Sequence, residues 1–101
     1  MLTLVRTLQF SKWLEALGDH RGKAKVFVRL RNAALGHFGD CGAVGEGVSE
    51  MRIDFGPGYR IYFVRSGPNI YVLLAGGDKS SQTRDIVLAK KLAREIEEAR
   101  Q

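Results

Sequence analysis

The segment from residue 51 to residue 64 constrains the fold of this chain most. Apolar residues alternate with charged ones over Met51–Phe55, as expected for a strand with one buried face. Gly56-Pro57-Gly58 follows and is a strong turn signal. Pro57 presets φ at the first central position of a type II turn, and Gly58 accepts the positive φ needed at the second. Tyr59–Val64 is then predicted to return as an antiparallel strand, with Arg60, Tyr62 and Val64 on one face.

The flanking segments extend this hairpin to the predicted order β-α-α-β-β-β-α. The other predicted elements are a strand over 3–9, a helix from a cap at Ser11 through Leu17, a helix capped by Asp19 through about Leu35, a loop over 36–47 with a strand beginning near Val44, a strand over Ile70–Ala75, and a helix capped by Ser80 or Ser81 through about Ala99. The first two helices are separated by a short break and should form a hairpin.

Apolar stripes mark the inner faces of the two longer helices. The second helix is predicted to bury Ala24, Phe27, Leu30 and Ala34. The last helix is predicted to bury Ile86, either Ala89 or Lys90, Ala93 and Ile96. We therefore expect an α+β fold in which the helical hairpin and the C-terminal helix pack on a mainly antiparallel sheet as two layers, with the second face of the sheet partly open. At 101 residues the chain is expected to form a single domain over 1–101.

The net charge of +5 lies entirely in the first third of the chain. Residues 1–36 hold seven Lys or Arg and two acidic residues, whereas residues 37–101 hold nine of each. Such polarity favours an anionic partner, either nucleic acid or an acidic protein. No apolar run is long enough to cross a membrane, and the single Cys41 cannot form an internal disulfide. A cytoplasmic protein without a membrane partner is expected.

Three cations on the predicted sheet are the candidate catalytic residues. Arg52 and Arg60 flank the turn on paired strands, and Lys79 follows the next strand, where the last helix begins. A phosphate could lie between the guanidinium groups and near the helix N-terminus. The alternative is that Arg52 and Arg60 pair with Glu50 and Asp54 on a solvated face of the sheet.

A second group of residues is predicted to bind RNA. Tyr59 and Tyr62 offer rings on which bases could stack, and the second helix presents cations four residues apart at Arg21, Lys25 and Arg29. The sequence contains no phosphate-binding glycine loop, no His-Glu-x-x-His motif and no cysteine pair. No metal and no cofactor are therefore expected.

Several motifs carry a resemblance to a known family. They are Gly58-Tyr-Arg-Ile-Tyr-Phe63, Gly77-Asp-Lys-Ser-Ser-Gln82, Asp85-Ile86, and Val44-Gly-Glu-Gly-Val-Ser-Glu-Met-Arg-Ile-Asp54. With them the chain resembles the RelE/HigB-like type II toxins of the ParE/RelE superfamily, and most closely the branch of addiction-module killer proteins. The resemblance extends over nearly the whole chain.

The resemblance implies a toxin that enters the ribosome and cuts mRNA without a metal, through attack of the RNA 2′-hydroxyl on the adjacent phosphate. Arg52, Arg60 and Lys79 match the basic residues that hold the scissile phosphate in related toxins. The implied partners are a helix-turn-helix antitoxin, the ribosome and mRNA.

The group that transfers the proton is not assigned by the resemblance. Related toxins carry a tyrosine or histidine near the last helix or at the C-terminus, and this chain has neither. Asp85 is more readily explained as a first-turn acid of the last helix, and Tyr62 could substitute only if it projects into the cleft. Enzymatic activity is therefore left open. The alternatives are a non-enzymatic inhibitor on the same fold, such as a ParE-like toxin that binds gyrase, or an antitoxin-binding remnant without activity.

Overall fold

The computed structural model describes residues 1–100, which form one mixed sheet of five strands and three α-helices. The elements are β1 (Thr3–Arg6), α1 (Leu8–Ala16), α2 (His20–Ala34), β2 (Cys41–Gly45), β3 (Val48–Ile53), β4 (Tyr59–Gly67), β5 (Ile70–Asp78), a 3₁₀ turn η1 (Lys79–Ser81) and α3 (Gln82–Ala99).

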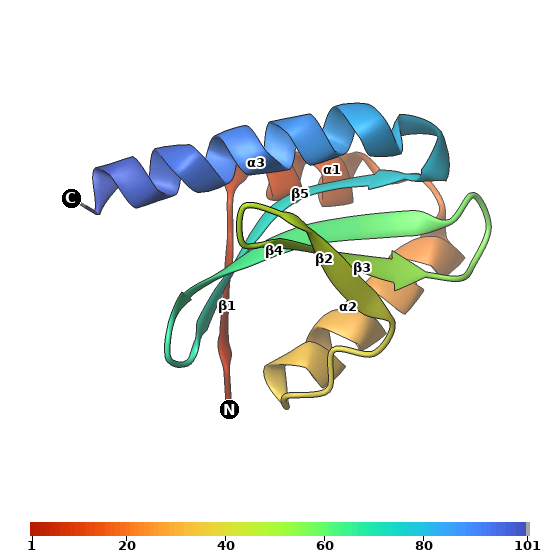
Figure 1. The fold of residues 1–101 in the computed structure, drawn as a ribbon. Helices are drawn as coiled ribbons and strands as arrows, with labels where there is room; N and C mark the ends of the chain where they lie inside the picture. Colours follow the sequence, from red (N-terminus) through yellow and green to blue (C-terminus); the bar gives the residue numbers. More distant parts are fainter. Residues whose placement is uncertain (101) are drawn as a thin grey trace.

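The sheet has the order β1-β5-β4-β3-β2, and only the β1–β5 pair is parallel. The chain therefore begins at one edge of the sheet and reaches the opposite edge at β2 through the α1–α2 hairpin (Figure 1). From β2 to β5 it returns strand by strand as an antiparallel meander. The predicted α+β class and the antiparallel hairpin around residues 56–58 are confirmed.

Helices cover both faces of the sheet, so the predicted two-layer arrangement is wrong. One buried cluster joins the hairpin to the sheet; it includes Phe10 and Leu14 of α1 and Val26 and Leu30 of α2. The other cluster joins α3 to the opposite face and is centred on Tyr62, Leu74 and Ala89. Odd-numbered residues of β4 from Tyr59 to Phe63 enter the first cluster, while Tyr62 and Val64 enter the second, as strand alternation requires.

Both ends of the β1–α1 connection differ from the prediction because Thr7 acts as the helix cap. Its hydroxyl accepts the Phe10 amide at 3.1 Å and donates to the Leu74 carbonyl at 2.7 Å, which ties α1 to β5. The strand consequently ends at Arg6 rather than at residue 9, and the helix begins at Leu8 rather than after Ser11.

The Asp19 cap of α2 is confirmed, whereas the predicted stripe on this helix is only partly right. The Asp19 carboxylate accepts the Gly22 amide at 3.0 Å. Leu30 is buried as expected, but Ala24 and Phe27 are exposed. Val26 and Ala33 complete the buried stripe, each one residue before the predicted Phe27 and Ala34.

The glycine-rich segment over 36–47 is a loop and a turn around the edge strand β2, Cys41–Gly45. The strand predicted to begin near Val44 therefore begins three residues earlier, at Cys41, and it is a separate strand. A two-residue turn joins it to β3, and both turn residues have positive φ, 55° for Glu46 and 78° for Gly47. Such angles suit a tight hairpin and favour glycine. The start of β2 was misplaced because Gly42 and Gly45 dilute its alternation.

The hydrogen-bonded turn between β3 and β4 lies one residue earlier than predicted. The Gly58 amide donates to the Phe55 carbonyl at 3.0 Å, so Gly56 and Pro57 are the central residues. Gly56 and Gly58 both have positive φ, 55° and 78°, so the positive φ expected at Gly58 is present.

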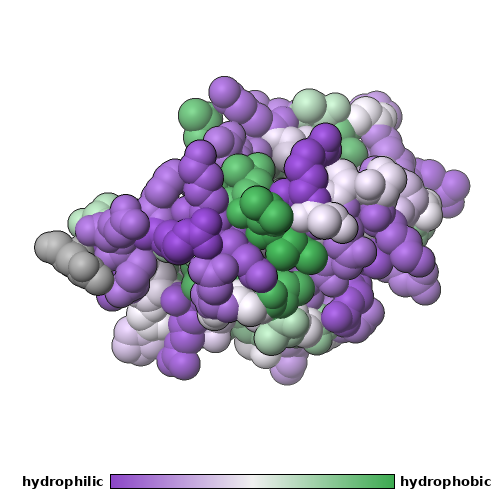
Figure 2. All heavy atoms as spheres, turned by 45° about the horizontal axis from the view of Figure 1, so that its top comes forward, coloured by the Kyte–Doolittle hydropathy of each residue, from purple (hydrophilic) through white to green (hydrophobic). Residues whose placement is uncertain are grey.

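The last helix begins after a capped 3₁₀ turn. The Asp78 carboxylate accepts the Ser80 amide at 2.8 Å, and Ser81 completes a capping box. On α3, the predicted inner residues Ile86, Ala89, Ala93 and Ile96 lie in the cluster that joins this helix to the sheet. Seen from the side that carries α3, the surface shows a narrow hydrophobic band between hydrophilic regions (Figure 2).

Candidate functional site: a cationic pocket beside the β3–β4 turn

The three predicted cations line one pocket. Arg52 of β3 and Arg60 of β4 are directly opposite partners in the ladder, and Lys79 opens η1 at the end of β5. With the 56–58 turn and two carboxylates, Asp40 and Asp54, they enclose a volume of about 290 Å³. Strand alternation places both arginines on the face of the sheet that carries α3, beyond the start of that helix. The structure thus brings together the three cations that the sequence singled out.

A buried glutamate holds the two arginines. Glu50 lies two residues before Arg52 on the same face of β3 and is only 2% exposed. One carboxylate oxygen accepts from Arg52 Nε at 3.2 Å and lies 3.9 Å from Arg60 Nε. Like charges directly opposite on paired strands repel each other, so Glu50 supplies the compensating charge between them.

The second oxygen of Glu50 is bonded to neutral groups. It accepts from the Tyr62 hydroxyl at 3.1 Å and from Gln82 Nε2 at 2.7 Å. Because Gln82 is the first residue of α3 and Tyr62 lies on β4, one carboxylate connects three elements. A buried charge is stable only when it is paired and hydrogen-bonded, and Glu50 meets both conditions.

The arginines keep donors that no described residue uses. Arg60 Nη1 donates to the carbonyls of Gly58 and Tyr59 at 3.0 and 3.2 Å, whereas its buried Nε makes no hydrogen bond. Its Nη2 and the Nη2 of Arg52 also have no hydrogen-bond partner among residues 1–100. The Lys79 ammonium forms no ion pair with the described carboxylates. The two Nη2 groups and the Lys79 ammonium suit an anion with several oxygens, such as a phosphate, whereas the buried Arg60 Nε faces Glu50.

Asp40 partly closes the pocket. Its carboxylate accepts from Arg52 Nη1 at 3.0 Å, and both side chains are substantially exposed. This hydrogen bond is the main reason that the pKa of Arg52 is raised above its ordinary value, so Arg52 stays charged. An exposed ion pair contributes little to stability, so an incoming phosphate can replace Asp40 at Arg52 at small cost.

The 56–58 turn shapes the pocket through Gly58. A Cβ at this position would lie 3.2 Å from Arg60 Nη1, and the residue also has positive φ. Glycine therefore satisfies both the backbone conformation and the close approach of the guanidinium group.

The alternative prediction was that Arg52 and Arg60 pair with Glu50 and Asp54 on a solvated face of the sheet. The structure confirms the pairing with Glu50 but not the solvated face. Glu50 does pair with Arg52, but it is buried under α3 rather than solvated. Asp54 forms no ion pair with the other described residues. The alternation of β3 does not show that α3 buries Glu50. It was therefore not predicted that Glu50 holds the two arginines and that Gln82 donates to Glu50.

Tyr59 and Tyr62 do not provide stacking surfaces, which corrects the prediction that they bind RNA bases. Tyr59 packs edge-on against Trp13, and its hydroxyl donates to Asp19 at 2.7 Å on the other side of the sheet. That hydrogen bond, together with burial, raises the pKa of Tyr59 to about 12. Tyr62 is fully buried, and burial beside Glu50 raises the pKa of its hydroxyl. Neither ring projects into the cationic pocket.

Asp85 is explained by its position in the first turn of α3. It is buried beside Gly77, accepts from the Ser81 hydroxyl at 2.5 Å, and does not line the cationic pocket. Its role as a first-turn acid fits this geometry. Among the described residues that line the pocket, only Asp40 and Asp54 carry a carboxylate.

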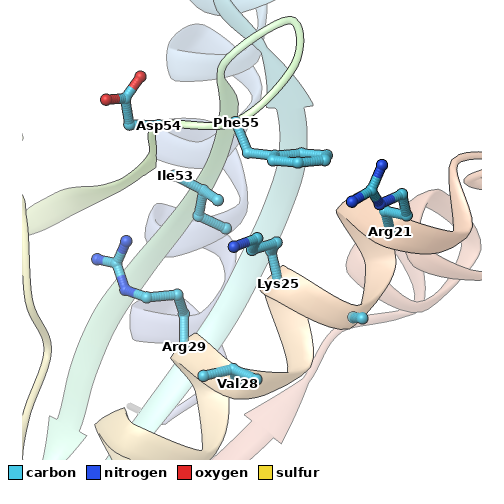
Figure 3. Close-up of a pocket in the computed structure, with 8 residues that line it drawn as sticks. Arg21, Lys25, Val28, Arg29, Ile53, Asp54 and Phe55 are labelled. Atoms are coloured by element: carbon cyan, nitrogen blue, oxygen red, sulfur yellow. The ribbon is translucent and has the colours of Figure 1, made fainter.

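The predicted RNA-binding cations of α2 lie apart from the cationic pocket. Arg21, Lys25 and Arg29 border a separate hollow of about 510 Å³ between α2 and the end of β3, which we name the α2 groove (Figure 3). The other residues that line it are Ala24, Val28, Ile53, Asp54 and Phe55.

Arg29 is largely occupied in holding the backbone. Its guanidinium donates to the carbonyl of Arg52 at 2.5 Å and to those of Phe38 and Asp40 at 2.9 and 3.2 Å. It thereby anchors the start of β2 and the end of β3, on which the pocket residues Asp40 and Arg52 lie. Arg21 and Lys25 make no hydrogen bonds through their side chains to residues 1–100.

Residues 1–100 contain neither a cluster of metal-binding side chains nor a helix suited to cross a membrane. No three His, Cys, Asp or Glu side chains gather closely enough to hold a metal ion. None of the described helices combines the length and apolar character needed to cross a membrane.

Comparison with known proteins places the chain in a family without assigning an activity. No protein-family model matches the sequence. A Haemophilus influenzae protein (strain Rd), described only as uncharacterized, is 46% identical over 90 residues, which is 89% of this chain and 91% of that protein. Identity at this level over nearly both full lengths shows that the chain belongs to the same family as the Haemophilus influenzae protein.

Proposed function

We propose that this chain is a RelE/HigB-like toxin of a type II toxin–antitoxin system and that it cuts mRNA on the ribosome. The observation that supports this most is the pocket beside the β3–β4 turn, where Arg52, Arg60 and Lys79 face a common volume with donors to spare. The motifs that flank these cations are those on which the resemblance rests. The order of the elements, with one further edge strand at β2, is compatible with a RelE-like topology.

The proposed reaction is transesterification within the RNA. The 2′-hydroxyl gives up its proton as its oxygen attacks the adjacent phosphorus and forms the O2′–P bond. The P–O5′ bond breaks, and the leaving 5′-oxygen takes up a proton. The products are a 2′,3′-cyclic phosphate and a 5′-hydroxyl. Fixed cations stabilise the extra negative charge that the phosphorane carries. Arg52, Arg60 and Lys79 supply that charge, and no metal takes part.

The experiment that tests this uses purified chain, ribosomes and a defined mRNA. Cleavage should leave 5′-hydroxyl ends, and a 2′-deoxy nucleotide at the cleaved position should prevent the cut because the nucleophile is missing. Cleavage of the 2′-deoxy substrate at an unchanged rate would contradict the mechanism.

A non-enzymatic toxin is the second candidate, and one observation favours it. The tyrosine hydroxyls that could move a proton are bonded away from the pocket, to Asp19 and to Glu50. Such a protein would use the same cations to bind rather than to cut, as a ParE-like gyrase inhibitor or as an antitoxin-binding remnant. Inhibition of DNA supercoiling by purified gyrase, with mRNA left intact, would favour this candidate.

Both candidates imply a helix-turn-helix antitoxin as the partner. Co-expression of the neighbouring reading frame should then restore growth of cells that express the chain. The absence of any neighbouring gene with this effect would count against the toxin–antitoxin assignment.

A further inference from the structure

The α2 groove differs from the cationic pocket in position and in chemistry. The two hollows adjoin at Asp54, which lines both. Most of the groove lies on the other side of β3, where Ile53 joins the core beneath the hairpin, whereas Arg52 faces the cationic pocket. Aliphatic and aromatic side chains form its floor, and cations form its rim (Figure 3). We propose that the α2 groove docks an acidic, amphipathic helical segment of a partner protein. This proposal does not depend on the RNA-cleaving function.

The apolar floor of the α2 groove is complementary to apolar side chains of a partner. Val28 is 49% exposed although it lies beside Ile53 and Phe55 in the groove. Covering such a surface with an apolar side chain is favourable at roughly 25 cal/mol per Å² removed from water. An amphipathic helix is the usual occupant of a groove of this kind and inserts side chains spaced three or four residues apart.

The cationic rim of the α2 groove is complementary to partner carboxylates that have the same spacing as Arg21 and Lys25. Arg21 and Lys25 lie four residues apart on α2, which is about one turn or roughly 6 Å along the helix. Two glutamates four residues apart on a facing helix can therefore meet both cations at once. Asp54 is the only carboxylate that lines the groove, and in Figure 3 it points away from α2.

The same contacts argue against RNA as the occupant. Lys25 Nζ lies over the Phe55 ring, 5.5 Å from its centre, so this cation occupies the position that a stacked base would take. The guanidinium of Arg29 already donates to three backbone carbonyls. An RNA strand would need cations along its whole path and exposed aromatic faces, whereas the middle of the groove is aliphatic.

The test uses a synthetic probe with the stated chemistry. It is a fluorescein-labelled helical peptide of about 14 residues, or four turns, with leucines along one seam and glutamates beside it. Control peptides replace the leucines by serine or the glutamates by lysine, and a labelled single-stranded RNA provides the rival ligand. Binding is followed by anisotropy, and its location by amide chemical shifts of the full chain.

The proposal predicts that the acidic peptide shifts the amides of residues 21–29 and 53–55 and that both control peptides bind at least tenfold more weakly. Val28→Glu should weaken binding at least tenfold, because it places a like charge on the floor. Val87→Glu is the matched control, since Val87 is also an exposed valine on a helix, 64% against 49% for Val28, but lies outside the groove. Lys25→Glu should also weaken binding, and Lys91→Glu should not.

Three results would overturn the proposal. The first is an acidic peptide that does not bind at millimolar concentration. The second is equal affinity for the Val28→Glu variant and the unmodified chain. The third is RNA that shifts the groove amides more than the peptide does and that loses affinity with Lys25→Glu but not with Val28→Glu. The last result would assign the groove to nucleic acid instead.

Discussion

Arg60 is the residue on which the cationic pocket depends most. Its side chain is 11% exposed, it lies opposite Arg52, and its Nη1 is fixed by two carbonyls of the turn. We expect Arg60→Ala to reduce RNA cleavage by about 100-fold, the usual effect of removing one donor from a developing oxyanion. The matched control is Arg65→Ala, which removes an exposed arginine from the same strand. Full activity of Arg60→Ala would show that the site is wrongly placed.

Glu50 is expected to be the most costly residue of the site to lose. Glu50→Ala removes the acceptor of three hydrogen bonds and leaves Arg60 without a counter-charge. Breaking a buried ion pair on one side typically costs about 3 kcal/mol. Urea unfolding should show a loss of that size for Glu50→Ala, a smaller loss for Glu50→Gln, and almost none for the exposed control Glu95→Ala. An unfolding free energy unchanged by Glu50→Ala would contradict the described network.

At the residue scale, alternation was sufficient to place Arg52 and Arg60 on one face but not to say what covers that face. Lys79 joined them because the last strand ends beside the turn. Burial of Tyr62 and Glu50 depends on α3, which is remote in sequence and crosses this face of the sheet. The positions of the cations could therefore be predicted, and the buried carboxylate that positions them could not.

At the element scale, the N-terminus of α2 should be sensitive to acid. The Gly22 amide, and next the Tyr59 hydroxyl, hold the pKa of Asp19 below its usual 3.8. The charged carboxylate therefore stabilises the fold above pH 3.8, and this contribution is lost as pH falls through the lower pKa of the folded state. The difference in unfolding free energy between the natural chain and Asp19→Asn should accordingly shrink between about pH 5 and pH 2. A constant difference over this interval would contradict the role of Asp19.

The junction of β5 and α3 offers a second test at this scale. A Cβ at Gly77 would overlap the Asp85 carboxylate and approach the Ser81 hydroxyl. Gly77→Ala should therefore displace the first turn of α3 and lower stability by about 1–3 kcal/mol, as overpacking usually does. Gly18→Ala is the control, because a Cβ there meets nothing within 4 Å. Thermal unfolding of the two variants separates these outcomes.

The elements themselves were predictable where local signals were strong. The Asp19 cap, the turn glycines and the inner face of α3 follow from capping, positive φ and helical spacing. The start of β2 was placed too late and its separation from β3 was not recognised, because β2 is glycine-rich. The Thr7 cap was missed because Thr7 is fixed by a carbonyl of β5, 67 residues away. The side of the sheet that α3 covers is a tertiary property, and no local pattern encodes it.

At the scale of the whole molecule, charge is divided between two sites on opposite sides of β3. If the cationic pocket holds RNA phosphates through three cations, the logarithm of the affinity for single-stranded RNA should fall with the logarithm of salt concentration with a slope of about −2. Removing one cation with Arg60→Ala should make the slope shallower by about 0.7. Fluorescence anisotropy over a salt series measures both slopes, and an unchanged slope would exclude Arg60 from phosphate binding.

Mapping of RNA 5′ ends in cells tests most directly whether the pocket of Arg52, Arg60 and Lys79 acts on mRNA. After brief induction of the natural chain, we predict new 5′-hydroxyl ends within translated reading frames, together with arrested translation. The Arg60→Ala variant, expressed at the same level and folded, should produce neither. Induction of the natural chain without new ends and with translation unaffected would contradict an action of this pocket on mRNA.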